Sequence, residues 1–126
     1  MKKAGDRGED LAVNHLREKG YTILERNWRG VKGFRSPELD IISQIGEIIV
    51  FIEVKTVSTS KFGPPQFRIT TAKQKRIGDG AKAYLAINNL DSCECRFDAI
   101  MIDLGIQPPE IQHIENAFML ADTDFA

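Results

Sequence analysis

An unbroken run of β-branched and aromatic residues, Ile48 to Ile52, constrains the fold of this chain more than any other segment. A short apolar run bounded by polar residues is typical of a strand that is buried on both faces of a sheet. We therefore expect a central strand from about Glu47 to Thr56. Glu53 and Lys55 lie at its end, where charged side chains are costly unless they are paired or bound to a metal.

A second strand is expected just before it, over 38–43, with a turn at 44–46. Residues two apart on a strand share a face, so Glu38 and Asp40 point one way, and Glu53 and Lys55 point one way. If the two strands pair, three carboxylates and one ammonium group can meet in one patch. Such a patch can bind a hard divalent cation, and a structural ion-pair cluster at a strand end is the alternative.

The remaining segments predict an α/β fold with a mixed central sheet flanked by helices. The helix between the strands over 47–56 and 96–103 favours a right-handed parallel connection between them. We expect one domain over 1–126, with a tail from about 119 to 126 that frays. The expected helices are 5–19 and about 71–87, and the other expected strands are 21–28, 96–103 and a short edge strand, 111–114.

The composition is that of a globular protein, with 42% hydrophobic and 28% charged residues in a chain of 126. No run is long enough for a membrane span, and the first residues lack the apolar segment of a signal peptide, so we expect a cytoplasmic protein without membrane contact. We interpret Cys93 and Cys95 as ordinary thiols and His113 as a packed side chain. Arg96 and Asp98 are expected to pair and brace the sheet.

The net charge of −1 hides an asymmetry between the two parts of the chain. Residues 1–87 hold 16 Lys and Arg against 10 Asp and Glu, whereas residues 88–126 hold 1 against 8. A basic face in the first part suits a polyanion such as nucleic acid, although an ordinary solvated surface is the alternative. The candidate phosphate-contacting residues are Arg29, Lys32, Arg35, Lys61, Arg68, Lys73, Gln74, Lys75 and Arg76.

The central patch suits phosphodiester chemistry with Mg²⁺ or Mn²⁺. Asp40 and Glu53 can supply two carboxylate ligands, and the main-chain carbonyl of Val54 a third ligand. The cation would polarise the scissile phosphate and lower the pKa of a bound water. Lys55 can hold that water, and Glu38 or Glu9 can bind a second ion or orient water.

These segments resemble the YraN family of small bacterial proteins and, more widely, the PD-(D/E)XK nuclease superfamily. The superfamily motif corresponds to Pro37, Asp40 and Glu53-Val54-Lys55, although the YraN family usually has a glycine where Pro37 stands. The resemblance implies an α-β-β-β-α-β core like that of Holliday-junction resolvases and restriction endonucleases. It also implies Mg²⁺ at Asp40 and Glu53, Lys55 as the catalytic lysine, and Glu9 and Glu38 as acidic residues of the site. The segments that carry the closer resemblance are Gly8 to Ala12, Gly20-Tyr21, Glu38-Leu39-Asp40, Phe51 to Lys55, Phe62-Gly63, Lys73-Gln74, Arg96-Phe97-Asp98 and His113 to Phe118.

Our main hypothesis from the sequence is a metal-dependent nuclease that acts on DNA, with branched or otherwise structured DNA as a candidate substrate. A chain of this size leaves little surface for reading bases, so recognition of shape or backbone is favoured. The alternative is a nucleic-acid-binding module that kept the site but cuts weakly or needs a partner. A homodimer and a protein partner in DNA processing both remain open.

Overall fold

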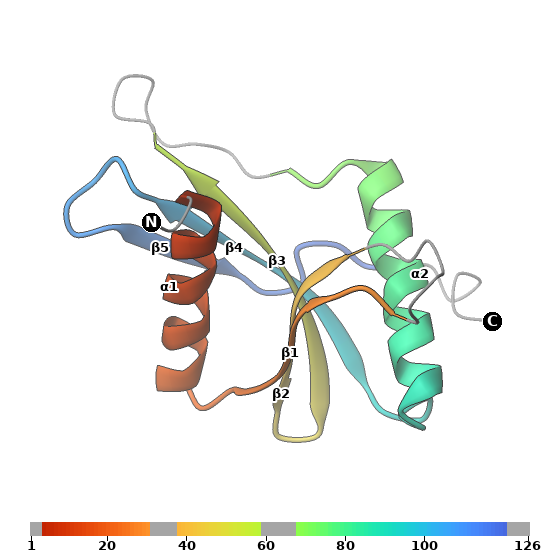
Figure 1. Cartoon of the computed structure of the whole chain (residues 1–126). Coiled ribbons are helices and arrows are strands. Elements are labelled where there is room, and N and C mark those ends of the chain that lie inside the picture. Colours follow the sequence, from red (N-terminus) through yellow and green to blue (C-terminus); the bar gives the residue numbers. More distant parts are fainter. Residues whose placement is uncertain (1–3, 31–37, 59–67, 121–126) are drawn as a thin grey trace.

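The computed structural model describes residues 4–30, 38–58 and 68–120 (Figure 1). Two helices and five strands follow one another in the order α-β-β-β-α-β-β. This order confirms the expected α/β fold with a mixed sheet and is compatible with a restriction-endonuclease-like core. The elements are α1 (Ala4–Glu18), β1 (Thr22–Trp28), β2 (Leu39–Ile45), β3 (Ile48–Val57), α2 (Thr71–Ile87), β4 (Cys95–Asp103) and β5 (Glu110–Ile114).

The five strands form one sheet in the order β1-β2-β3-β4-β5, so β3 lies in its centre. β3 and β4 are parallel and are joined through α2, whereas the other neighbours are antiparallel. The parallel connection and the edge position of β5 were both expected. The observed element ends differ from the predicted ones by one or two residues.

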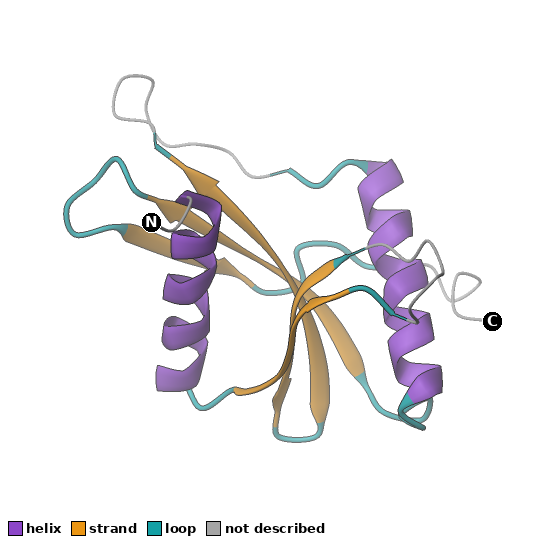
Figure 2. Ribbon diagram, in the orientation of Figure 1, coloured by secondary structure: helices purple, strands orange, loops and turns teal. Residues whose placement is uncertain are grey.

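The two helices cover opposite faces of the sheet (Figure 2). On the face of α1, Val50 and Ile52 pack in a cluster with Leu16. On the face of α2, Ile49 and Phe51 pack in a second cluster with Tyr84. Alternate residues of β3 therefore enter two different cores, which confirms the prediction that the apolar run is a strand buried on both faces.

A tight hairpin fixes the register of β2 and β3. Ile45 pairs with Ile48, so Gly46 and Glu47 alone make the turn, and the expected turn at 44–46 is wrong because β2 continues through Ile45. Gly46 has a φ of +58°, which a residue without Cβ adopts at low cost. The pairing runs back to Ile41 and Ile52. Asp40 and Glu53 are the next residues beyond this last pair.

A buried polar network braces the sheet on the face of α1. Asp98 is 1% exposed and accepts two hydrogen bonds from Arg96, of 2.9 and 2.8 Å. Its Oδ2 also lies 2.7 Å from His113 Nε2, and Arg96 reaches the Tyr21 hydroxyl at 2.7 Å. These bonds lower the pKa of Asp98 against the effect of its burial, which raises it. The expected Arg96–Asp98 pair and the packed His113 are thus confirmed.

Neither helix of the described ranges has the length and apolar character that a membrane crossing requires.

Candidate active site

Asp40 occupies the point at which β2 turns away from β3. Leu39 packs in the core on the side of α2, whereas Ile41 packs in the core on the side of α1. Residues two apart on a regular strand share a face, so β2 must rotate between them. Asp40 Oδ2 then accepts a hydrogen bond of 2.9 Å from the main-chain N–H of Val54. The Asp40 carboxylate thereby accepts a hydrogen bond from β3 that a backbone carbonyl would accept in a regular pair of strands.

Asp40 and Glu53 form a close carboxylate pair. Burial raises the pKa of Asp40, and the neighbouring Glu53 raises it further, while the hydrogen bond from Val54 lowers it. The result is a pKa of about 7 for Asp40, against an ordinary value of 3.8. A hydrogen bond between the two carboxyl groups also raises the pKa of Asp40. Near neutral pH, a large share of the Asp40 carboxyl groups therefore keeps its proton and shares it with Glu53.

The main-chain carbonyl of Val54 faces the same opening as Asp40. On an extended strand the N–H and C=O of one residue point to the same side, and the Val54 N–H points to Asp40. Val54 also lines a cavity of about 500 Å³ together with Asp40. Asp40 and Val54 therefore border one opening, and Asp40 shares a second, smaller cavity of about 220 Å³ with Glu53.

Two lysines approach Glu53 from different elements. Lys55 lies two residues further along β3, is exposed, and lines a cavity of about 420 Å³ together with Glu53. Lys73 comes from the first turn of α2, and its Nζ lies 2.5 Å from Glu53 Oε1. Lys73, which was expected to contact phosphate, is thus a close ammonium partner of Glu53.

Glu9 reaches the opening from α1, as the sequence analysis had allowed. Gly8 lies so close to the Thr56 side chain at the end of β3 that a Cβ atom would overlap the Thr56 hydroxyl. This close approach brings the next residue, Glu9, to the cavity that Asp40 lines. Arg26 Nε and Asn27 Nδ2 hold the Glu9 carboxylate at 3.1 and 2.9 Å.

Glu38 lies at the rim rather than in the carboxylate pair. Its side chain is 39% exposed, and its Oε2 lies 3.7 Å from Arg29 Nη2. Glu38 borders both the cavity of about 500 Å³ and a smaller one of about 220 Å³. The expected meeting of three carboxylates is therefore a pair of the half-buried Asp40 and the buried Glu53, with Glu38 at its entrance.

The cavities on the two sides of Asp40 differ in charge. Among the described residues, the larger one, of about 500 Å³, is bordered by the acids Asp6, Glu9, Glu38 and Asp40 and by no Lys or Arg. The two on the side of α2 hold the cations Lys55, Arg68, Lys73 and Arg76 beside the acids Glu38, Asp40 and Glu53. An anionic ligand would enter through the cavity of about 420 Å³, where three cations face the single acid Glu53.

The comparisons with known proteins agree on one family. The model of the uncharacterised protein family UPF0102 matches residues 8–102. The chain belongs to the UPF0102 family. It is 46% identical over 121 residues to a UPF0102 protein of Geobacter metallireducens, covering 95% of each chain. A UPF0102 protein of Chlorobium chlorochromatii is 41% identical over 120 residues, covering 90% of this chain and 89% of the relative. The expected membership in the YraN family, which is UPF0102, is confirmed.

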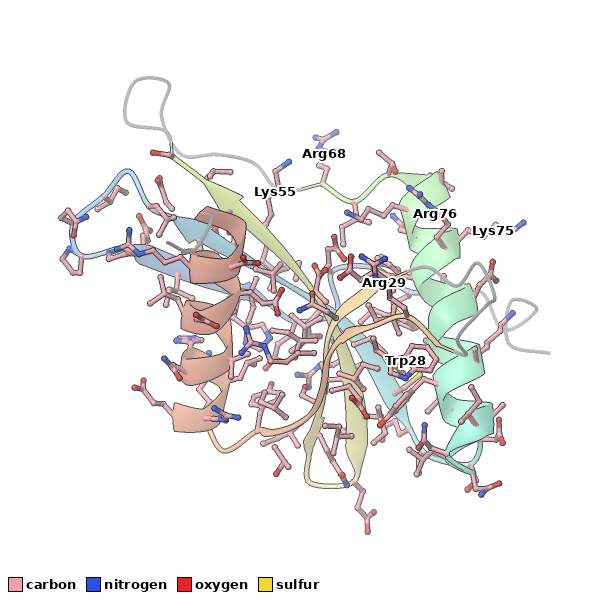
Figure 3. The ribbon with its side chains drawn as sticks, viewed as in Figure 1. Trp28, Arg29, Lys55, Arg68, Lys75 and Arg76 are labelled. Carbon is pink, nitrogen blue, oxygen red and sulfur yellow. The ribbon has the colours of Figure 1, made fainter. Side chains whose placement is uncertain are left out.

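The candidate phosphate-contacting residues of this UPF0102 chain lie in different places. Arg68, Lys73 and Arg76 border the cavities beside Glu53. Figure 3 shows Arg68 and Lys55 projecting to the same edge of the molecule and Lys75 pointing away from the sheet. Gln74 donates to the Ile69 carbonyl at 2.9 Å and, with Lys75, borders a separate cavity of about 330 Å³. Arg29 pairs with Glu38, and Lys32, Arg35 and Lys61 lie outside the described residues.

The sequence analysis missed Arg26 and Asn27, which hold Glu9. A register shift between Ile23 and Glu25 interrupts the pairing of β1 with β2. Asn27 then adopts a φ of +50°, a left-handed conformation that asparagine tolerates better than most residues. Sequence alternation alone does not reveal such a shift. An Arg-Asn pair before Trp28 was the available signal, because Asn is enriched at positive φ.

The donor set of the opening fits Mg²⁺ or Mn²⁺. Among residues 4–30, 38–58 and 68–120, no three Asp, Glu, His or Cys side chains converge as a ready metal cluster. Mg²⁺ commonly takes only one or two carboxylates and keeps water or phosphate oxygens for its other positions. The Asp40–Glu53 pair with the Val54 carbonyl meets that requirement, and a cation there would relieve the repulsion that raises the pKa of Asp40.

Proposed function

We propose that this UPF0102 protein is a metal-dependent nuclease that hydrolyses phosphodiester bonds in DNA. The observation that carries the proposal is the close pair of the half-buried Asp40 and the buried Glu53, which lies beside cavities bordered by lysines and arginines. Two adjacent acids that are largely withdrawn from water weaken a fold that has no cation between them. Such a cost at a cavity is typical of a functional site.

The roles of the residues follow from their positions. A bound Mg²⁺ or Mn²⁺ would supply Lewis-acid polarisation of the scissile phosphate and activation of water. Asp40, Glu53 and the Val54 carbonyl are the oxygen donors that would hold the ion. Lys55 shares a face of β3 with Glu53, from which it would orient the attacking water and offset negative charge on the phosphate. Glu9, held by Arg26 and Asn27, would orient water from the opposite side.

The cations on the side of α2 support a nucleic acid as the substrate. Arg68, Lys73 and Arg76 border the cavities beside Glu53, where phosphates of a strand would lie. Phosphate contacts position a strand but carry no base sequence. We therefore expect recognition of backbone and shape, with branched or structured DNA as the first candidate and RNA as the comparison.

A second candidate function is nucleic-acid binding with weak or partner-dependent cleavage. The observation that favours it is the ion pair of Lys73 with Glu53, which already neutralises one of the two proposed metal ligands. A site in this state binds phosphates through its cations without cutting them. A protein partner or the correct substrate would then be needed to complete the site.

One cleavage assay separates the two candidates. Wild type, Asp40→Asn and Asp79→Asn are incubated with linear, flapped and four-way DNA and with RNA in Mg²⁺ or Mn²⁺. Asp79 is an exposed acid of α2 that borders the separate cavity with Lys75, so its variant is the matched control. We expect Asp40→Asn to cut at least about 100-fold more slowly than wild type, and Asp79→Asn to cut at the wild-type rate. Binding without any cleavage above Asp40→Asn would overturn the nuclease and support the binding module.

A further inference from the structure

The ion pair between Lys73 and Glu53 joins the start of α2 to the carboxylate pair. The Glu53 side chain is 10% exposed and the Lys73 side chain 47% exposed, and their charged atoms lie 2.5 Å apart. Glu53 is shielded from water in this pair, whereas Lys73 is half exposed, so water screens the attraction between them only in part. The ammonium therefore neutralises one of the two groups that would hold a cation.

The backbone under Lys73 is fixed, whereas its side chain can change partner. The Lys73 N–H donates to Thr70 Oγ1 at 3.2 Å, and the Gln74 N–H donates to the Thr70 carbonyl at 2.9 Å. These bonds cap α2 and hold its first turn. The ammonium stands on a flexible four-carbon stem that is half exposed, so rotation of side-chain bonds alone can move it.

Lys73 borders two cavities that share Glu53. The smaller cavity also contains Asp40, and the larger one also contains Lys55 and Arg68. In the larger cavity three cations from three segments surround one acid, so a phosphate there would meet mostly positive charge. A divalent cation at Glu53 would repel the ammonium, and a phosphate oxygen in the larger cavity would attract it.

We propose that Lys73 and the divalent cation exchange at Glu53. In the metal-free protein the ammonium holds the carboxylate, and when the cation binds, the ammonium moves to a phosphate of the substrate. This inference rests on the proposed function, because it needs a cation at Asp40 and Glu53. It makes Lys73 a positioning residue that sets the metal affinity and links metal binding to substrate binding. By that linkage, DNA and metal each strengthen the binding of the other.

The first test is the affinity for Mn²⁺ without DNA, measured by calorimetry at pH 8. The variants are Lys73→Met, which removes the competing charge, and Lys75→Met, which removes the same charge from the outward side of α2. Methionine is a good helix former, so both variants keep α2. We expect Lys73→Met to bind Mn²⁺ about 5- to 10-fold more tightly than wild type, and Lys75→Met to stay within about twofold.

The outcomes separate the inference from the proposed function. Unchanged or weaker Mn²⁺ binding in Lys73→Met, with tight binding in wild type that Asp40→Asn abolishes, would overturn the exchange and leave the metal site intact. Absence of Asp40-dependent Mn²⁺ binding in wild type would overturn the metal site and the inference together.

The second test follows the ammonium to the phosphate. The affinity for a labelled DNA duplex is measured by fluorescence anisotropy in EDTA and in Ca²⁺, which occupies a carboxylate site and slows cleavage. We expect Ca²⁺ to tighten DNA binding of wild type and of Lys75→Met by several-fold more than that of Lys73→Met. An equal gain in all three proteins would contradict the move of Lys73 to the substrate.

Discussion

Replacing Asp40 by asparagine in the absence of metal is expected to stabilise the protein in a pH-dependent manner. Asparagine has nearly the shape of a protonated aspartic acid. Its oxygen can keep the bond from the Val54 N–H, and its amide can donate toward Glu53 where Asp40 shares a proton. The variant therefore keeps the contacts of the protonated pair and removes the charge that appears as the pH rises.

The pKa of Asp40 sets the size and the direction of the effect. Burial and Glu53 raise this pKa from 3.8 to about 7. A folded-state pKa above the unfolded value means that the folded protein binds the proton more tightly, so wild type loses stability as the pH rises from about 4 to 7. Each pK unit corresponds to about 1.4 kcal/mol, so the full loss approaches about 4 kcal/mol. Between pH 5 and pH 8, the stability gap between Asp40→Asn and wild type should grow by about 2–3 kcal/mol.

Urea unfolding in EDTA measures this gap at pH 5 and pH 8. The single tryptophan, Trp28, packs at 5.3 Å from the Tyr84 ring between β1 and α2, so its fluorescence reports the folded core. Glu38→Gln is the control, because Glu38 is an acid of the same opening that is 39% exposed. Its stability relative to wild type should change by less than about 0.5 kcal/mol over this pH range. A gap for Asp40→Asn that is constant with pH, or that shrinks from pH 5 to pH 8, would refute the buried pair as described.

Three further predictions concern the supports of the site. Mn²⁺ at about 100 times its Kd should stabilise wild type by about 2–3 kcal/mol and Asp40→Asn by nothing measurable, and an equal thermal shift in both would count against Asp40 as a ligand. Gly8→Ala should cost about 1–3 kcal/mol in urea unfolding, because its Cβ overlaps the Thr56 hydroxyl, and an unchanged midpoint would contradict this packing. Asp98→Ala should cost about 3–5 kcal/mol, because the half-buried guanidinium of Arg96 loses its carboxylate, and a loss below about 1 kcal/mol would show that the network is not a brace.

The meeting of Asp40 and Glu53 could be predicted from the sequence because it depends on local rules. Two apolar runs that flank a glycine predict a hairpin, and the hairpin brings together the strand ends that carry Asp40 and Glu53. The register itself was not predicted, because the turn was expected at 44–46 and lies at Gly46 and Glu47. The central position of β3 followed from its continuous apolar run for the same reason. These features require only the spacing of residues within a span of fewer than about 20 positions.

The pairing of Lys73 with Glu53 depends on how α2 packs, which spacing alone does not give. Lys73, Lys75 and Arg76 carry the same charge and all lie near the start of the helix. Ile77, Ala81 and Tyr84 are among the buried residues of α2 that pack toward the sheet, and Lys73 lies one turn before Ile77 on that side. The helical spacing therefore indicates that Lys73 lies on the side of α2 that faces the sheet. It does not indicate that Glu53 lies beneath this turn, because that is a tertiary contact.

The contact between Glu9 and the opening was predictable only as a possibility. Helical spacing allowed Glu9 to face inward, but its position is set by the close approach of Gly8 to Thr56 and by bonds from β1. Both depend on the docking of α1 against the sheet. The irregular pairing of β1 then decides which of its side chains reach Glu9.

Anomalous diffraction from crystals soaked in Mn²⁺ at about pH 8 tests the central claim most directly. Our account predicts one strong anomalous peak at coordination distance, about 2.0–2.3 Å, from Asp40, Glu53 and the Val54 carbonyl oxygen. It also predicts that the peak disappears in Asp40→Asn crystals. A fully soaked wild-type crystal with no peak between these residues, or a peak that persists without the Asp40 carboxylate, would contradict the metal centre on which the proposed nuclease depends.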